Sequence, residues 1–299
     1  MALRLITTEE LIAMPQPEWL VDDTIQLSSL GMLYSESGLG KTFVMLDIAC
    51  HVAMGKPWMG KPVKQGKVLF IAAEGQTGLG KRILAWNAAH NERVSGIHWL
   101  VNDVGKLNHF EIKSAIASVV PNPALVVIDT LNRTSVGMDE NSAKDMGEYL
   151  DTLEQLRVET GAAVVVIHHT GHIESTRPRG SSTIMPTMDT LINLSQKDGI
   201  LRLSCDKQKD AEKFQPMYIR LQHSEDSLVV MPSQYKPSLE KKVTAKEQMV
   251  TVINGQSLTA GQWQKLVPSI SERQFFRVKS ELEASGMVVE ADGKFHFVP

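Results

Sequence analysis

Unbroken apolar runs alternate with polar, glycine-containing segments along the first three quarters of this chain. The clearest runs cover residues 30–34, 67–72, 125–128 and 162–167. A run that is apolar at every position, rather than at alternate positions, indicates a strand buried on both faces, as in a parallel sheet. The pattern therefore predicts an α/β domain with a mainly parallel, twisted sheet flanked by helices.

Longer segments between these runs have the length and spacing of helices. Residues 43–54 are apolar and stop at Gly55, and residues 81–86 form a second candidate. A third begins at Asn141 or Ser142 and extends to about residue 160, with apolar residues at a helical period. Residues 97–101 add a strand, whereas the polar segment 130–140 is predicted to be a loop.

The sheet is expected to end in hairpins. Residues 190–194 and 201–205 read as strands, and Asp198-Gly199 between them is a turn signal. Shorter strands near 217–221 and 228–231 complete it.

The composition changes near residue 232 and predicts a second, small domain. Residues 232–242 are polar and flanked by prolines, as expected of a linker. Residues 243–299 then predict helices over 245–253 and 258–266, a third capped by Ser271, and a hairpin over 287–298. The predicted organisation is an N-terminal strap at 1–29, a core domain at 30–231, a linker at 232–242 and a small domain at 243–299.

Residues 35–42, Ser-Glu-Ser-Gly-Leu-Gly-Lys-Thr, join the first predicted strand to the first predicted helix. Gly38 and Gly40 allow backbone N–H groups to turn toward a phosphate, and the helix N-terminus adds partial positive charge. Lys41 supplies a cation for the outer phosphates, and the Thr42 hydroxyl can bind Mg²⁺. The strand–loop–helix context favours this interpretation over a glycine-rich turn that binds nothing. The predicted phosphate-binding residues are Ser37, Gly38, Leu39, Gly40, Lys41 and Thr42.

The usual phosphate-loop pattern begins with glycine, and this chain has Ser35 at that position.

Two carboxylates follow predicted strands. In an open α/β sheet, ligands bind at the carboxyl ends of the strands. Glu74 comes just after residues 67–72 and can either accept a proton from an attacking water or lie on the surface; its position alone leaves both open. Asp129 ends the run 125–128, and the upstream phosphate loop favours a role in holding Mg²⁺ over one in capping the next turn.

The run 162–167 ends in His168-His169-Thr170-Gly171-His172. Zinc is disfavoured there because no cysteine or carboxylate set completes a site at a familiar spacing. A polar sensor of a terminal phosphate fits a strand end better, and His169 is the choice. Arg177 and Arg179 follow in a hydroxyl-rich segment that is either phosphate-binding or simply solvated.

Charge and cysteine usage narrow the possible classes of function. The formal net charge is −3 with a pI of about 6.3, so any nucleic-acid site must be local. Cys50 and Cys205 lie far apart on apolar elements, which suits core packing in a reducing, cytoplasmic setting. No apolar stretch is long enough to span a membrane, so no membrane partner is expected.

Together these segments resemble the RecA-like P-loop ATPase core, and most of all the hexameric-helicase branch typified by plasmid RepA proteins and the DnaB family. The resemblance covers roughly residues 20–232. The matching segments are Ser37-Gly38-Leu39-Gly40-Lys41-Thr42, Glu74 after its strand, Ile128-Asp129-Thr130, His168-His169, Arg179-Gly180-Ser181-Ser182 and Lys207-Gln208-Lys209.

The resemblance implies a role for each matching residue. Glu74 would be the general base and Asp129 the Mg²⁺ carboxylate, while His169 would sense the γ-phosphate of ATP. Lys207 and Lys209 would reach into the ATP site of a neighbouring subunit. DnaB-type relatives have an arginine at the second of these positions, and Lys209 offers a point charge instead of a bidentate fork.

For function, the resemblance implies Mg²⁺-dependent ATP hydrolysis coupled to binding and translocation on single-stranded DNA. The protein would be a ring-forming, replicative-type helicase of phage, plasmid or bacterial origin, expected to be a hexamer. Arg133, Arg177 and Arg179 would lie in loops that face DNA. The alternatives are a recombinase-like or loader ATPase that binds DNA without unwinding it, and an ATP-switched DNA-binding regulator.

Residues 243–299 are similar to a winged helix-turn-helix domain. Its third helix would expose Arg273, Arg277 and Lys279 toward the phosphates or base edges of duplex DNA. The other interpretation is a docking module for a replication protein.

Overall fold

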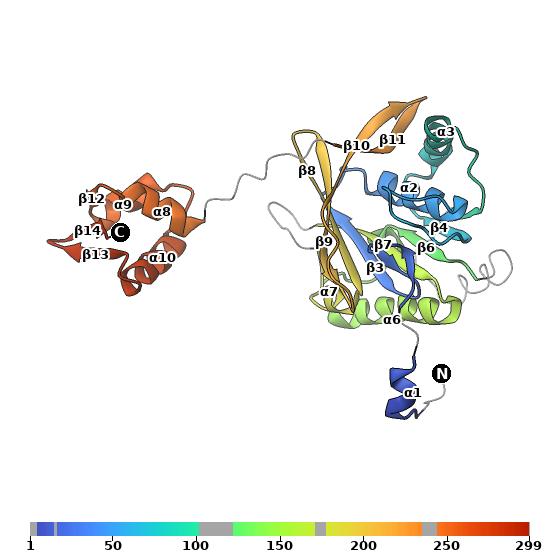
Figure 1. Ribbon diagram of the computed structural model, residues 1–299, viewed down its shortest axis with the longest axis horizontal. Coiled ribbons are helices and arrows are strands. Elements are labelled where there is room, and N and C mark those ends of the chain that lie inside the picture. The colour runs from blue at the N-terminus through green and yellow to red at the C-terminus, as the bar shows by residue number, and fades with distance from the viewer. Residues whose placement is uncertain (1–4, 15–16, 102–121, 171–177, 235–243, 299) are drawn as a thin grey trace. The chain divides into compact units, whose positions relative to one another are not determined.

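The structure is a computed structural model that describes residues 5–14, 17–101, 122–170, 178–234 and 244–298. Arg177 and most of the predicted linker lie outside these residues. The chain divides into two compact units, Met1–Lys236 and Pro237–Pro299 (Figure 1).

The first unit is built on one sheet with the strand order β11-β10-β9-β8-β3-β7-β6-β4-β5. Six strands, β8, β3, β7, β6, β4 and β5, are parallel to one another. The strands β9, β10 and β11 extend the sheet beyond β8, and each is antiparallel to the strand before it. The mostly parallel sheet expected from the apolar runs is thus confirmed. The bounds are β3 Leu30–Ser35, β4 Val68–Ala72, β5 Ile97–Leu100, β6 Leu125–Asp129, β7 Ala163–His169, β8 Thr190–Lys197, β9 Ile200–Gln208, β10 Met217–Ser224 and β11 Ser227–Pro232.

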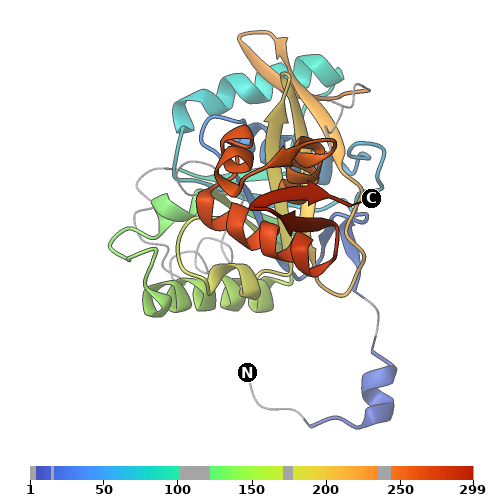
Figure 2. The same ribbon diagram turned by 90° about the vertical axis from the view of Figure 1, so that its left-hand side faces the viewer.

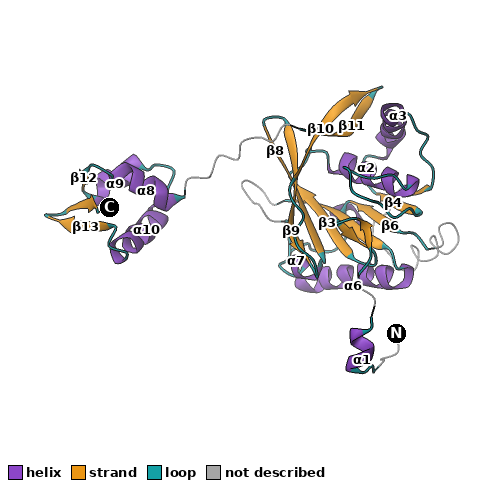
Figure 3. Ribbon diagram, viewed as in Figure 1, coloured by secondary structure: helices purple, strands orange, loops and turns teal. Residues whose placement is uncertain are grey.

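Helices cover both faces of this sheet, which explains why its central strands are apolar at every position (Figure 3). On one face, α2 (Lys41–Met54) packs on side chains such as Leu33 and Val165. On the other, α6 (Ala143–Thr160) packs on the intervening side chains, such as Met32. The unit also contains α3 (Leu79–His90), α7 (Ile184–Thr187) and the 3-10 turn η1 (Gln76–Gly78).

The N-terminal segment contains α1 (Thr8–Ile12) and a small hairpin of β1 (Trp19–Val21) and β2 (Ile25–Gln26). No residue of α1 is buried. Leu20 and Ile25 of the hairpin belong to the same core cluster as α2.

The loop predicted at 130–140 contains one helical turn, α5 (Leu131–Thr134). The prediction was wrong there because the turn depends on burial rather than on periodicity. Leu131 packs in the core, and the Thr134 hydroxyl donates to the carbonyl of Thr130 at 2.9 Å. A helix this short has no apolar period for the sequence to reveal.

The second unit is drawn in orange and red in Figure 2. Its elements are α8 (Ala245–Ile253), β12 (Ser257–Leu258), α9 (Ala260–Leu266), α10 (Glu272–Ala284), β13 (Val288–Ala291) and β14 (Lys294–Phe297), with the sheet order β12-β14-β13. Trp263 is fully buried among Phe275 and Phe295 at its centre. The hydroxyl N-caps Thr244, Thr259 and Ser271 begin the three helices. The second helix starts at residue 260, not 258, because Ser257–Leu258 pairs with β14.

Both cysteines, Cys50 and Cys205, are buried free thiols. None of the helices in the described part of the chain has the length and apolar content needed to cross a membrane.

Candidate active site

A pocket opens at the carboxyl ends of β3, β4, β6 and β7, where residues 36–40 lead into α2. From this loop and helix it is lined by Ser37, Gly38, Gly40, Lys41 and Thr42. From the ends of the other strands it is lined by Glu74, Asp129 and His169. The residues that were predicted to share one site from four distant parts of the sequence therefore lie together. Leu39 instead packs against the hydrophobic core beside α2.

The glycines of the loop have the backbone conformation that the sequence suggested. Gly38 and Gly40 have φ angles of 82° and 91°, which L residues with a side chain rarely adopt. Gly40 is also the N-cap of α2, and a Cβ on it would lie 2.9 Å from Cδ1 of Leu221. The loop therefore turns directly into the helix, whose unpaired N–H groups and partial positive charge face the pocket.

Lys41 is held at the base of the pocket by several acceptors. Its Nζ donates to the carbonyl and hydroxyl oxygens of Ser35, both at 3.1 Å, and to the carbonyl of Glu36 at 2.9 Å. It also lies 3.1 Å from Nδ1 of His169. Burial lowers the pKa of Lys41 to about 8. Ser35, where the usual pattern has glycine, contributes a side-chain acceptor for this ammonium.

Thr42 and Asp129 form the pair expected to bind Mg²⁺. The Thr42 hydroxyl donates to Oδ2 of Asp129 at 2.7 Å. Ligands at 2.0–2.1 Å in an octahedron are roughly 2.9 Å apart along an edge, so these two oxygens fit adjacent positions around one Mg²⁺ ion. Burial raises the pKa of Asp129 to about 6, and the hydrogen bond from Thr42 opposes that shift.

Glu74 lies on the exposed segment that follows β4. The Thr130 hydroxyl donates to Oε2 of Glu74 at 3.4 Å, a long contact that ties it loosely to the end of β6. A carboxylate that is solvent-accessible and beside the phosphate loop is suited to contact a water molecule.

Arg82 is a pocket residue that sequence reasoning missed. It projects from α3 with its guanidinium 4.5 Å from the centre of the Phe43 ring, and both side chains line the pocket. The sequence predicted a helix at this position without its orientation. The sequence did contain one indication of this position. The predicted helix begins soon after Glu74, so its first turns must pass close to the site.

The two histidines at the end of β7 have different surroundings. His169 lines the pocket, and burial, followed by the charge of Lys41, lowers its pKa. His168 is buried away from it, with Nε2 2.8 Å from the carbonyl oxygen of Arg179. His172 lies outside the described residues.

The predicted DNA-binding arginines of the first unit differ in their contacts. Arg133 is exposed on α5. Arg179 has its Nε 3.0 Å from Oε2 of the buried Glu140, which also accepts a hydrogen bond from Asn132. Glu140 thus joins the segment after β6 to the segment after β7. Arg179 is half exposed in spite of this ion pair.

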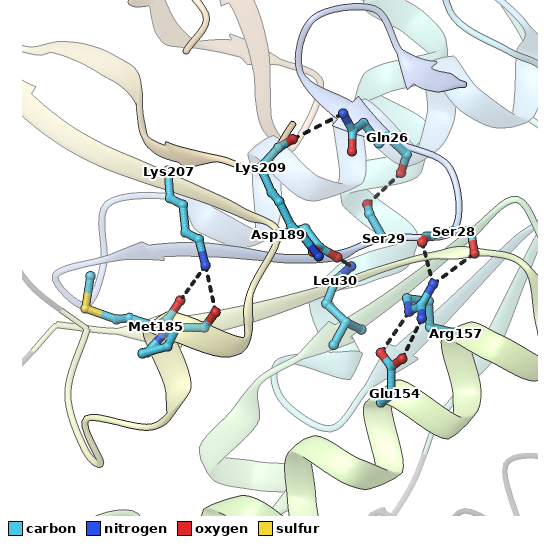
Figure 4. Close-up of polar contacts among 11 residues, drawn as sticks. Gln26, Ser28, Ser29, Leu30, Glu154, Arg157, Met185, Asp189, Lys207 and Lys209 are labelled. Atoms are coloured by element: carbon cyan, nitrogen blue, oxygen red, sulfur yellow. Dashed lines mark hydrogen bonds and ion pairs between the residues drawn. The ribbon is translucent and has the colours of Figure 1, made fainter. Parts of the chain in front are cut away.

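Neither Lys207 nor Lys209 lines the pocket of its own chain. Figure 4 shows the polar contacts that the two lysines make instead. Lys207 Nζ donates to the carbonyl of Pro186 at 2.7 Å, and Lys209 Nζ lies 3.3 Å from Oδ1 of Asp189. Oδ2 of Asp189 accepts from the N–H of Leu30, the first residue of β3, at 2.9 Å. The pocket lies at the carboxyl end of β3, so Lys209 lies near the opposite ends of the strands.

In the second unit, α10 carries the predicted basic residues. Arg273 and Arg277 are exposed, and Arg277 Nε lies 3.8 Å from Glu281. The expectation that Lys279 is exposed was wrong. Its side chain is 15% exposed because its ammonium pairs with Glu283 at 3.1 Å and lies 4.1 Å from the centre of the Phe295 ring.

Two comparisons with known proteins agree with this arrangement. A family described as an AAA domain matches residues 5–175. Among solved structures, the crystal structure of the RadB recombinase is similar, with a TM-score of 0.50 and 17% sequence identity, over 66% of this chain and 89% of that chain. At this identity the likeness concerns the fold alone.

Proposed function

This chain belongs to the AAA domain family and has a RecA-like P-loop ATPase core, and from this premise we propose that it is a ring-forming DNA helicase driven by ATP. The observation that carries the proposal is the meeting of Lys41, Thr42, Glu74, Asp129 and His169 in one pocket. That set would supply a phosphate cradle, two Mg²⁺ ligands, a base and a polar sensor, which are the parts that ATP hydrolysis requires.

Binding of ATP would be governed by the phosphate loop. Backbone N–H groups of residues 37–42 surround the β-phosphate, and the Lys41 ammonium exchanges its carbonyl partners for phosphate oxygens. Thr42 and Asp129 hold Mg²⁺, which when bound neutralises charge on the β- and γ-phosphates.

Hydrolysis would depend on the residues at the strand ends. Glu74 orients the attacking water and accepts its proton, because its carboxylate is exposed to solvent beside the loop. His169 donates a hydrogen bond to the γ-phosphate as charge shifts toward the leaving oxygen.

Lys207 and Lys209 would act on the pocket of the next subunit in a ring, which we expect to be a hexamer. A head-to-tail interface brings one edge of a subunit against a different edge of its neighbour. Lys209 lies at the end of the sheet opposite the pocket, so the two surfaces are separate, as a head-to-tail interface requires.

Single-stranded DNA would contact the segments that follow β6 and β7. Arg133 lies on α5, directly after the Mg²⁺ carboxylate, and Arg179 follows the sensor histidine in the chain. Changes at the γ-phosphate can therefore alter the position of both segments. Arg177 remains part of this proposal from the sequence alone.

The second unit would be a winged helix-turn-helix domain. Three capped helices and a hairpin in the order described support this assignment, and Arg273 and Arg277 on α10 would contact duplex DNA or a replication protein. The ammonium of Lys279 already pairs with Glu283 and lies over the Phe295 ring, so we expect Lys279 to contribute less to DNA or protein binding than Arg273 and Arg277 do.

A second candidate function is a recombinase-like or loader ATPase that binds DNA without separating strands. The likeness in fold to the RadB recombinase favours it. The two functions share the pocket and differ in the mechanical step that hydrolysis drives.

The test is ATP turnover with and without single-stranded DNA at low salt, on the wild type and on Glu74→Gln. The control is Glu212→Gln, an exposed glutamate outside the pocket. We expect DNA to stimulate turnover in the wild type and the control and not in Glu74→Gln. Displacement of a labelled strand from a forked duplex then separates the functions, since a helicase releases the strand and a recombinase-like ATPase does not. Turnover that is indifferent to DNA would contradict both.

A further inference from the structure

Helices α2 and α3 bring three potential metal ligands together away from the pocket. Asp47 and His51 lie one turn apart on the same face of α2, and His90 is the last residue of α3. One ligand atom from each lies within 4.8 Å of the other two. The spacing of Asp47 and His51 is visible in the sequence, whereas the approach of His90 depends on the packing of the two helices.

Asp47 is a buried carboxylate with neutral partners. It is 2% exposed, and it accepts hydrogen bonds from Nε1 of Trp58 at 2.9 Å and from Nε1 of Trp86 at 2.8 Å. Each of its oxygens keeps a lone pair for another partner. Among the described residues no lysine or arginine pairs with it, and its nearest cationic candidate is Nε2 of His51 at 3.6 Å from Oδ1. Burial raises the pKa of Asp47, as expected for a carboxylate without a full countercharge.

The two imidazoles are held in place by the same surroundings. Nδ1 of His90 lies 2.9 Å from the carbonyl oxygen of Trp86, which can only accept, so Nδ1 carries the proton and Nε2 is left with a free lone pair. The His90 ring stacks on Trp86 at 4.1 Å, and the His51 ring meets Trp86 edge-on at 5.6 Å. Trp86 therefore orients Asp47 through its indole N–H, His90 through its carbonyl and both rings through packing.

We propose that Asp47, His51 and His90 bind one Zn²⁺ ion, with a water molecule as the fourth ligand, and that this ion ties the second half of α2 to the end of α3. Two imidazole nitrogens and one carboxylate form a set that Zn²⁺ prefers, and tetrahedral ligands at 2.0–2.2 Å are roughly 3.4 Å apart. The three atoms within 4.8 Å need only small side-chain rotations to reach that separation. The ion also supplies the positive charge that Asp47 lacks.

Two features of the surroundings support a bound ion over a plain polar core. Metal-bound histidines and carboxylates are usually oriented by hydrogen bonds from a second layer of groups, and Trp58 and Trp86 provide such bonds to Asp47 and His90. The site is also reachable from solvent, because the His51 side chain is 13% exposed and His90 is half buried. The trio is separate from His168 and His169.

The test is equilibrium dialysis of the full chain, first stripped with a chelator, against Zn²⁺ alone. Excess Mg²⁺ and ADP are present to block binding of Zn²⁺ in the nucleotide pocket, and bound zinc is counted by mass spectrometry. We expect about one equivalent in the wild type, its loss in His51→Gln and His90→Gln, and its retention in the exposed control His223→Gln.

Further measurements distinguish loss of this zinc site from misfolding and from zinc binding in the nucleotide pocket. Circular dichroism shows whether each variant is folded, and a rise in the unfolding temperature on adding Zn²⁺ is expected for the wild type and not for His90→Gln. Co²⁺ in place of Zn²⁺ should give the visible spectrum of a tetrahedral site in the wild type. Zinc that persists in folded His90→Gln and leaves in His169→Gln would assign the ion to the other pocket and overturn the proposal. A wild type that binds no zinc would do the same.

Discussion

The ammonium of Lys41 lies 3.1 Å from Nδ1 of His169, and the direction of this hydrogen bond is fixed by chemistry. A lysine ammonium has only donors, so Nδ1 accepts and the proton of the neutral imidazole lies on Nε2. Burial and the adjacent Lys41 lower the pKa of His169, which keeps the ring neutral at pH 7. His169 therefore has one N–H group to offer to a phosphate oxygen.

Replacing His169 by alanine removes that donor. We expect ATP turnover to fall by roughly 10²–10³-fold, the usual effect of losing one donor to developing negative charge, with little change in the affinity for ATP. His169→Gln restores an N–H donor at a similar distance and should recover part of the rate. Steady-state kcat and KM with His223→Ala as the control check this, and an unchanged kcat in His169→Ala would exclude the sensor role.

Arg82 should contribute to nucleotide affinity. Its guanidinium is placed in the pocket by packing over Phe43, which limits the entropy lost when it meets a phosphate. We expect Arg82→Ala to weaken ADP binding about tenfold, and Arg82→Lys, which keeps the charge without the planar stack, to be intermediate. Titration with a fluorescent ADP analogue measures both against Arg93→Ala, an exposed arginine of the same region. Equal affinity of Arg82→Ala and Arg93→Ala would contradict the assignment.

The pKa of Asp129 predicts how Mg²⁺ binding depends on pH. With a pKa of about 6, the carboxyl is mostly ionised at pH 7 and mostly protonated at pH 5. Because Mg²⁺ needs the carboxylate, its apparent affinity in the presence of ADP should fall about tenfold from pH 7 to pH 5. The same titration on Asp129→Asn should be weak and nearly independent of pH. A wild-type affinity that is constant between these pH values would refute the prediction.

The same shift has a consequence for stability without Mg²⁺. A carboxyl with a raised folded-state pKa favours the folded state below the unfolded pKa near 4, and this contribution is lost as pH rises through about 6. Asp129→Asn removes the buried charge and should raise the free energy of unfolding at pH 7 by roughly 1–3 kcal/mol. Urea unfolding at pH 7 and pH 4 is the measurement, and the gain should disappear at the lower pH.

Local pattern was sufficient for the framework of the first unit. A run such as 125–128 is apolar at every position, which indicates a strand buried on both faces. This prediction does not require knowing which helices cover the strand. The turn at Asp198-Gly199 between β8 and β9 was confirmed for the same reason, since its conformation depends on two adjacent residues. The strand ends then imply that Glu74 and Asp129 are close, because parallel strands end at one edge.

The features that the sequence did not reveal depend on contacts between distant segments. Lys279 lies four residues after Phe275, at the border of the apolar face of α10, and the ion pair with Glu283 together with the approach of Phe295 from β14 removes it from the surface. Arg82 faces the pocket because of how α3 lies against Phe43 of α2. Helical periodicity identifies the apolar face of a helix, but it does not define which distant segment packs beside that face.

Lys209 gives the last prediction, which concerns assembly. Its ion pair with Asp189 joins a 61% exposed ammonium to a 20% exposed carboxylate, and such pairs contribute about 0–1 kcal/mol. A neighbouring subunit can therefore displace it at little cost. If Lys209 acts on the next pocket, Lys209→Ala and Glu74→Gln should each be inactive alone for different reasons, because one lacks the donated cation and the other lacks the base.

Mixing these two variants should restore activity. In a random equal mixture, about a quarter of the head-to-tail interfaces pair an intact Glu74 with a neighbour's intact Lys209, so turnover should reach about a quarter of the wild-type value if interfaces act independently. The matched control mixes Lys209→Ala with the double variant Lys209→Ala/Glu74→Gln, in which no subunit can donate the lysine. Turnover in the first mixture that does not exceed the control would mean that Lys209 supports its own chain through Asp189 and not the ATP site of a neighbour.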